Sequence, residues 1–303
     1  FKTGIEYSDG WVDDSRLVAL CARDAAERGA EINTRTRLLG AERRGDLWEA
    51  RLVDLVSGAE RRAHAKALVN AGGPWVDEIL RGRLRQNAAE RIRLVRGSHI
   101  VTRRLFEHDR AYIFQNADGR VLFATPYEDD FTLLGTTDAD HQGDPGGAVC
   151  TEAETHYICK AVSEYFERPV SPDDVVWSFA GVRPLDDDGA GAAALASRDY
   201  ALKVTDQEGG APLLSVYGGK ITTFRKLAEA AVDRLAPYFD RLRPSWTKGA
   251  PLPGGAYARH HAPLLLQDLL RDHRFLTEAW ARRMIRSYGT EAAEILKGAS
   301  SAK

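Results

Sequence analysis

The chain has 303 residues and a formal net charge of −2 at pH 7. Its composition, 44% hydrophobic and 28% charged, is that of an ordinary globular protein and excludes a disordered or collagen-like chain. Basic and acidic side chains number 42 and 44, so the basic excess of a nucleic-acid-binding protein is absent and no nucleic-acid partner is expected. At about 150 residues per domain, the length predicts two domains or one large mixed domain.

The cysteines, the apolar runs and the first residue further limit the class of protein. Three cysteines without a CxxC pair favour a reducing compartment and argue against a zinc ribbon or a disulfide scaffold. No apolar run approaches the roughly 18 residues that a membrane span needs. The chain begins at Phe1 and its one methionine is Met284, so we expect a piece of a longer protein.

The first half of the chain predicts one helix followed by strands. Asp13 or Asp14 can cap a helix that Gly29 ends. Strand-like stretches follow at residues 31–37, 48–55 and 67–70, with turns at 45–46 and 57–58. Further strands are expected at residues 92–95, 99–101, 112–115, 121–126 and 131–136.

The second half returns to helices. Thr151 and Glu154 have the spacing of a capping box that opens a helix to about Phe166. Strands are predicted at residues 175–182, 200–205 and 213–217, and the last leads into a helix ending near Phe239. A linker at 244–255 precedes helices at 264–270, 276–288 and 292–297. Strands dominate the middle and strand–helix units the flanks, which indicates a mixed α/β enzyme with an inserted sheet domain.

One glycine pair lies at a strand-to-helix junction. Gly218 and Gly219 would let a backbone approach a ligand, and the helix start after Lys220 would offer N–H groups to an anion. The segment is not a P-loop, because Leu214 stands where that motif needs its first glycine. The alternative is a tight turn with a solvated lysine.

Three more segments contain residues suited to chemistry. Residues 70–75 include small residues at the end of a strand. They could allow a ligand to approach closely, or they could simply form a turn before the next helix. His99 can accept a hydroxyl proton, although a lone histidine is more often structural. Arg183 and Arg198 each stand in a constrained setting and could bind phosphate or carboxylate, although a surface salt bridge is the default for any one arginine.

Other patterns are weaker. Residues 189–194 fit G-x-G-x-x-A but follow an acidic run instead of a buried strand. Asp138, Asp140, His141 and Asp144 imitate a calcium loop, yet Val149 stands where its last ligand would be, and no metal site is expected. Nine arginines between Arg81 and Arg110 are expected to lie mostly on solvated strand faces.

In their order along the chain, these segments resemble the aerobic, FAD-dependent glycerol-3-phosphate dehydrogenases, a branch of the D-amino-acid-oxidase-like flavoproteins. The matching stretches are residues 6–17, 68–75, 96–101, 134–138, 177–185, 197–200, 213–225 and 252–255. Any one of them is weak evidence, whereas the ordered set covers nearly the whole chain.

The resemblance implies a fold and its division. It implies a mixed α/β (α+β) chain with parts of a GR2-type FAD-binding domain at 1–77 and 206–243. A mixed β-sheet substrate domain at 78–205 would be inserted, and 244–303 would form a linker and part of a C-terminal helical domain. The family's N-terminal GxGxxG unit and the end of its helical domain are missing. We therefore expect this chain to purify without stoichiometric FAD and to be inactive on its own.

The resemblance also implies a reaction and its residues. Oxidation of sn-glycerol 3-phosphate at C2 to dihydroxyacetone phosphate would proceed by hydride transfer to flavin, with electrons passed to a quinone. His99, Arg183 and Lys220 would be catalytic, and Arg183 and Arg198 would bind substrate. The cofactor-binding residues would be Gly72, Gly73, Pro74, Trp75, Gly181, Gly219, Lys220, Ile221 and Thr222.

The implied setting is cytoplasmic and peripheral to the cytoplasmic membrane, with a homodimer as the assembly. Three alternatives stay open. The first is an amino-acid oxidase of the same fold, and the second is a glycerophosphate oxidase that reduces O2. The third is an inactive or purely binding fragment without cofactor.

Overall fold

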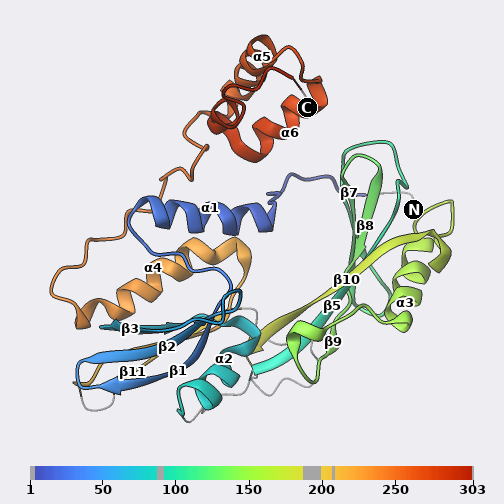
Figure 1. Cartoon of the computed structure of the whole chain (residues 1–303). Helices are drawn as coiled ribbons and strands as arrows, with labels where there is room; N and C mark the ends of the chain where they lie inside the picture. Colours follow the sequence, from blue (N-terminus) through green and yellow to red (C-terminus); the bar gives the residue numbers. More distant parts are fainter. Residues whose placement is uncertain (1–3, 87–91, 187–198, 207–208, 302–303) are drawn as a thin grey trace. The chain divides into compact units, whose positions relative to one another are not determined.

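A computed structural model describes residues 4–86, 92–186, 199–206 and 209–301. The chain forms two compact units (Figure 1): Thr36–Leu242, with the first residues of the chain, and a second unit made of Ile5–Arg35 and Arg243–Lys303. The predicted mixed α/β class is confirmed. The predicted domain boundaries at 77, 205 and 243 stay a prediction. No helix in the described part of the chain is both long and apolar enough to cross a membrane.

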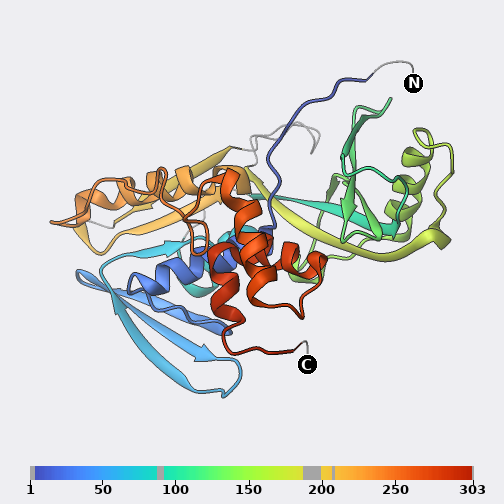
Figure 2. The ribbon, with the colours of Figure 1, turned by 90° about the horizontal axis from the view of Figure 1, so that it is seen from above.

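A six-stranded antiparallel sheet dominates the first unit. Its order is β10 (Val175–Asp186), β5 (Ile92–Arg103), β8 (Phe131–Gly135), β7 (Val121–Tyr127) and β6 (Tyr112–Gln115), and β9 (Ala139–Asp140) also pairs with β5. The long strands β5 and β10 lie side by side in both views (Figures 1 and 2). The prediction of two short strands at 92–95 and 99–101 was wrong, because residues 96–98 stay extended and pair with residues 180–182 of β10.

Helix α3 (Glu152–Ser163) covers one face of this sheet. Its capping box is confirmed, since Thr151 and Glu154 bond each other's backbone N–H groups. The helix ends at Ser163, before the predicted end near Phe166. Ile158 and Val162 of the helix are fully buried and share a core with Ile100 and Leu134 of the sheet. The opposite face of β5 and β10 is therefore available for the site.

Two smaller sheets complete the first unit. One is antiparallel: β1 (Thr36–Arg44), β2 (Leu47–Asp54) and β3 (Glu60–Ala65). In the other, β12 (Leu213–Gly218) pairs antiparallel with β11 (Tyr200–Thr205) and parallel with β4 (Leu68–Asn70). The strand predicted at 31–37 was wrong, because Arg35 has a φ of 51° and extended structure begins only at Thr36. Strand β3 was not predicted.

The chain segments after β4 and after β12 are helical. After β4 come a 3-10 turn (Gly73–Trp75), α2 (Val76–Glu78) and a π-helical turn (Ile79–Arg83). After β12 come a 3-10 turn (Ile221–Thr223), α4 (Phe224–Leu235) and a second 3-10 turn (Ala236–Tyr238). The predicted strand–Gly-Gly–helix order at 213–239 is thus confirmed.

The second unit is helical. Helix α1 (Asp14–Glu27) begins as predicted, with Asp13 accepting the backbone N–H of Arg16. Helices α5 (Ala262–Asp272), α6 (Glu278–Tyr288) and α7 (Ala292–Ile295) follow one another at the red end of the chain (Figure 2). They share a core that includes Leu269 and Ile285. Arg16 links α1 to them, because its Nε donates to the carbonyl of Ser287 at 2.8 Å and its guanidinium lies over the Tyr288 ring.

Candidate active site

His99 lies on β5, on the sheet face that α3 leaves uncovered. Its register neighbours are Phe179 of β10 and Gly135 of β8. The imidazole stacks on the Phe179 ring, with centroids 5.1 Å apart and planes 9° from parallel. A Cβ added at Gly135 would come within 2.3 Å of the His99 ring, so only glycine allows the ring to lie there. The ring is thus fixed between an aromatic face and bare backbone.

The electrostatic surroundings keep His99 uncharged. Burial, and after it the positive charge of Arg183, lowers the pKa of His99 to about 4. The imidazole is therefore neutral at pH 7 and has a free nitrogen lone pair for a proton. Ser98, the residue before His99, is fully buried and points to the other side of the strand, so it cannot share this role.

Arg183 of β10 lies on the same sheet face. It pairs in register with Val95, two residues from Gly97 on β5. Its guanidinium donates to Asp138 Oδ1 at 2.8 Å and to Thr136 Oγ1 at 3.0 Å. Because β10 continues to Asp186, this arginine stands inside the strand, and the predicted end of this strand at residue 182 was wrong. The ion pair with Asp138 fixes the direction of the guanidinium.

Two glycines separate His99 from Arg183 along the strands. Gly97 and Gly181 face each other in the β5–β10 register. A Cβ at Gly97 would lie 2.5 Å from an Arg183 nitrogen, whereas a Cβ at Gly181 would meet nothing within 4 Å. The guanidinium thus lies over Gly97, and the backbone at Gly181 is open. A flat ligand group could approach this bare backbone closely, which fits the predicted role of Gly181.

The segment at 72–75 lies beside this sheet. The 3-10 turn Gly73–Trp75 contacts both β10 and β12. Trp75 donates from Nε1 to Asp144 at 3.2 Å, and the buried amide of Asn70 donates to the Val76 carbonyl at 2.9 Å. A cavity of about 330 Å³ opens at the end of β4, lined by Leu38, Leu68, Val69, Asn70, Ala71, Gly72, Ile79 and Leu84. Gly72, the first residue of the predicted cofactor segment, therefore lines an open, mostly apolar cavity.

The Gly218–Lys220 turn also comes close to β10. Gly218 and Gly219 have φ values of 66° and 100°, which favour glycine. A Cβ at Gly218 would lie 3.7 Å from the carbonyl oxygen of Pro184, the residue after Arg183. Lys220, Ile221 and Thr222 are exposed at the start of the helical segment. Exposed N–H groups and a lysine there could hold an anionic edge of a cofactor.

Other predicted residues have different outcomes. Arg198 lies outside the described residues, as does the pattern at 189–194. Asp138 and Asp140 bond arginines, and no group of three or more metal-binding side chains occurs in the described part of the chain. Arg93 and Arg96 are ion-paired with Asp140 and Glu154 and mostly buried, so the expectation of solvated strand faces was wrong for them.

Sequence reasoning missed the support of Arg183. Thr136, Thr137 and Asp138 lie in one of the stretches that resemble the family, but no contact between them and Arg183 was predicted. Glu154 was assigned only to the capping box. A signal existed in the pattern Thr-Thr-Asp directly after a strand, since such short polar side chains often bind neighbouring groups. Their partner lies 45 or more residues away, so spacing alone could not identify it.

Comparisons with known proteins show the family to which the chain belongs. Residues 1–225 match the model of the FAD dependent oxidoreductase (DAO) family. The aerobic glycerol-3-phosphate dehydrogenase of Escherichia coli K12 is 43% identical over 297 residues, which cover 98% of this chain and 59% of that protein. The D-erythritol 1-phosphate dehydrogenase of Brucella abortus is 40% identical over 299 residues, covering 99% of this chain and 59% of that protein.

A solved structure is similar as well. The glycerol-3-phosphate dehydrogenase from Bacillus halodurans, complexed with FAD, has a TM-score of 0.82 and 28% identity, covering 94% of this chain and 55% of that chain. The chain thus spans a little over half the length of the relatives it matches. The ordered motifs, the fold and the family match agree, and the chain belongs to the FAD dependent oxidoreductase family.

Proposed function

We propose that the protein oxidises the C2 hydroxyl of sn-glycerol 3-phosphate to dihydroxyacetone phosphate, with FAD as its cofactor. One observation supports this most directly: a neutral His99 and an oriented Arg183 share one sheet face across the bare Gly97–Gly181 pair. Similarity to proteins named glycerol-3-phosphate dehydrogenase supports the choice of substrate.

His99 is the proposed general base. Its unprotonated imidazole nitrogen would accept the hydroxyl proton of C2. A pKa of about 4 describes the ring beside the positive charge of Arg183. A phosphate dianion bound near Arg183 would offset that charge, raise the pKa of His99 and make it a stronger base when substrate is present.

Arg183 is proposed to hold the substrate and the negative charge that develops at its C2 oxygen. A guanidinium already fixed by Asp138 and Thr136 needs no reorganisation during the reaction. Arg198 is proposed as the phosphate partner, because a planar fork of N–H groups fits phosphate. The two arginines would divide binding and catalysis between them.

The residues proposed to hold FAD are those around the two glycine-rich turns. Gly72 lines the apolar cavity and begins the turn that continues to Trp75. Gly219 to Thr222 are exposed and include the Lys220 ammonium. Gly181 offers open backbone on the sheet face. When bound, FAD supplies the hydride acceptor. The chain's own part is to bind it, orient the substrate and move the proton.

The relative from Brucella abortus supports a second candidate substrate. A D-erythritol 1-phosphate dehydrogenase at 40% identity shows that this level of similarity extends to a larger polyol phosphate. The same base and phosphate clamp would serve either substrate. Comparing kcat/KM for the two phosphates under identical conditions decides between them.

The acceptor, assembly and location are further proposals. We propose that electrons pass to a quinone, that the protein associates peripherally with the cytoplasmic membrane and that it forms a homodimer. The names of the relatives support the dehydrogenase over the oxidase, since they name dehydrogenases. Turnover with a soluble quinone compared with turnover under O2 alone tests the first proposal.

Variants test the assigned roles in the FAD-loaded enzyme. His99→Asn should keep FAD and lower kcat by 10²–10⁴-fold, the usual cost of losing a general base. Arg198→Ala should mainly raise KM, because phosphate is held in ground and transition states alike. A His99→Asn enzyme with near-normal kcat and full flavin content would remove His99 from the mechanism.

A further inference from the structure

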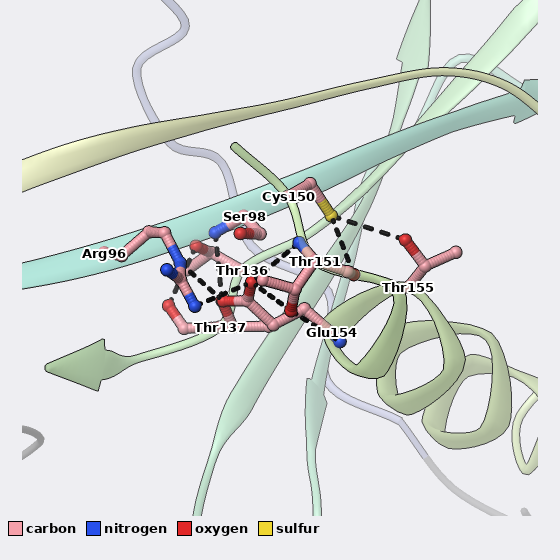
Figure 3. Close-up of polar contacts among 8 residues, drawn as sticks. All are labelled: Arg96, Ser98, Thr136, Thr137, Cys150, Thr151, Glu154 and Thr155. Carbon is pink, nitrogen blue, oxygen red and sulfur yellow. Dashed lines mark hydrogen bonds and ion pairs between the residues drawn. The ribbon is translucent and has the colours of Figure 1, made fainter. Parts of the chain in front are cut away.

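A buried polar network connects helix α3 to the segment that holds Arg183. Figure 3 shows Thr137 and Arg96 of β5 converging on Glu154 of α3. Glu154 Oε1 accepts from Thr137 Oγ1 at 2.9 Å and from Arg96 Nε at 3.2 Å. Glu154 Oε2 accepts from the backbone N–H of Thr151 at 3.0 Å. Thr137 is 2% exposed and Glu154 9%, so the network is shielded from water.

This network exceeds what a helix cap needs. A capping box requires only that the carboxylate reach the N-cap residue, Thr151, which Oε2 does. Oε1 accepts from Thr137 and from Arg96, and Arg96 Nη2 also lies 3.1 Å from Oε2. Burial alone would raise the pKa of Glu154, but hydrogen bonds from Thr151, Thr137 and Arg96 outweigh it and lower the pKa to about 2. The carboxylate is therefore a charged and permanent acceptor at neutral pH.

Thr137 is held on two sides. Its Oγ1 donates to Glu154 and accepts the backbone N–H of Ser98 at 2.9 Å. The residues before and after it, Thr136 and Asp138, receive two N–H groups of Arg183. The fixed Thr137 thus sets where both acceptors of the guanidinium stand.

We propose that Thr137 and Glu154 are positioning residues that aim the Arg183 guanidinium at the candidate active site. The backbone carbonyl of Thr137 also accepts from Arg183 Nη1 at 3.4 Å, whereas Glu154 acts on Arg183 through Thr137. The expected change in kcat/KM rests on the proposed function. The expected change in the position of the Arg183 guanidinium does not depend on that function.

The test uses His99 as a reporter of where the Arg183 charge lies. Thr137→Val keeps the side-chain volume but removes the hydroxyl that joins Ser98 and Glu154. If the guanidinium is released, the pKa of His99 should rise above about 4, because the Arg183 charge is the smaller of the two causes that lower it and burial remains. NMR titration of the histidine ring follows this change. In the FAD-loaded enzyme kcat/KM should fall about 10- to 100-fold, the range expected for a small misplacement. Thr137→Ser, which retains the hydroxyl, should restore both values.

A double-mutant cycle shows whether the effect passes through Arg183. In an Arg183→Gln background the charge is gone, so Thr137→Val should cause no further change in the pKa of His99. An equal pKa change in both backgrounds would overturn the proposal, because Thr137 would then act on His99 by another route.

A second capping box supplies the matched control. Asp174 caps the 3-10 turn Pro172–Asp174 by bonding Ser171, as Glu154 caps α3. Asp174→Asn should cost stability without moving the pKa of His99. If Thr137→Val behaves the same way, Thr137 and Glu154 are structural only and the proposal is wrong.

A further variant covers failure of Thr137→Val to fold. Glu154→Gln then replaces it, because a neutral amide keeps the volume but weakens the hold on Thr137. The same rise in the pKa of His99 supports the proposal, and an unchanged value overturns it. An unmodified enzyme that does not oxidise glycerol phosphate would contradict the proposed function and leave the titration result intact.

Discussion

At the scale of single residues, the site depends on two side chains held against bare backbone. His99 lies on Gly135, and Arg183 passes over Gly97. In each case the missing Cβ leaves room for a ring or a guanidinium that carries the chemistry. The functional residues and the glycines beneath them therefore form one unit, because a methyl group on either glycine would displace the side chain that lies over it.

The lowered pKa of His99 makes stability depend on pH. The folded value of about 4 is below the ordinary 6.5, so the unfolded chain binds the proton more tightly. The contribution of neutral His99 to the unfolding free energy is complete above pH 6.5 and is lost as the pH falls toward 4. Between pH 7.5 and pH 5 this loss is about 2 kcal/mol.

Denaturant unfolding of His99→Asn checks this. The difference in unfolding free energy between pH 7.5 and pH 5 should be about 2 kcal/mol smaller in the variant than in the unmodified chain. An identical pH dependence in both proteins would show that His99 titrates normally. His108→Asn is the matched control, because that histidine is exposed on the same unit.

The glycine pair offers a second measurement. Gly97→Ala places a methyl group against the guanidinium of Arg183 and should lower the unfolding free energy by about 1–3 kcal/mol, as overpacking does. Gly181→Ala, at the directly opposite position, meets open space and should leave stability unchanged or slightly raised. Equal losses in both variants would contradict the packing of Arg183 over β5.

At the scale of elements, local signals located some strands and helices and failed at others. The limits of β6 and β11 match the predicted 112–115 and 200–205. Helix α1 was predictable because an aspartate cap and a terminal glycine frame it. By contrast, Gly97 within β5 indicated a break, although cross-strand pairing with β10 keeps the chain extended there. Pairing between distant strands overrides local propensity, and spacing along the chain does not report it.

The candidate site shows the same division. His99 and Arg183 could be singled out because their residue types and neighbours suit proton transfer and anion binding. Their ring and guanidinium partners could not, since Phe179 and Thr136 reach them only through strand register. Glu154 was recognised as a cap from its three-residue spacing to Thr151. Its Oε1 accepts a hydrogen bond from Thr137, which is 17 residues away in sequence, and a local pattern cannot predict such a contact.

At the scale of the whole molecule, the second unit is built from two distant segments. Helix α1 has 14 residues, none of them buried, and isolated helices of that length are marginal in water. Arg16 contacts Ser287 and Tyr288, and Arg28 lies over Trp246. The persistence of α1 is thus expected to depend on residues that follow 243.

Hydrogen exchange on a shortened chain tests this dependence. Ending the chain at residue 242 should remove most amide protection in α1 while β5 and β10 keep theirs. Ending it after residue 297 spares these contacts and should leave α1 as protected as before. Retained protection in α1 without residues 243–303 would show that other contacts hold it.

The three cysteines have a practical consequence. Cys21, in α1, and Cys150, beside α3, are half-buried and lie in different units, whereas Cys159 is buried inside α3 and burial raises the pKa of its thiol to about 11. Maleimides react with thiolates, so Cys159 should stay unlabelled. The natural sequence therefore already contains two cysteines that can carry labels for a distance measurement. Spin labels or a fluorophore pair at Cys21 and Cys150 would record, without any engineered cysteine, whether the spacing of the units changes when a polyol phosphate binds.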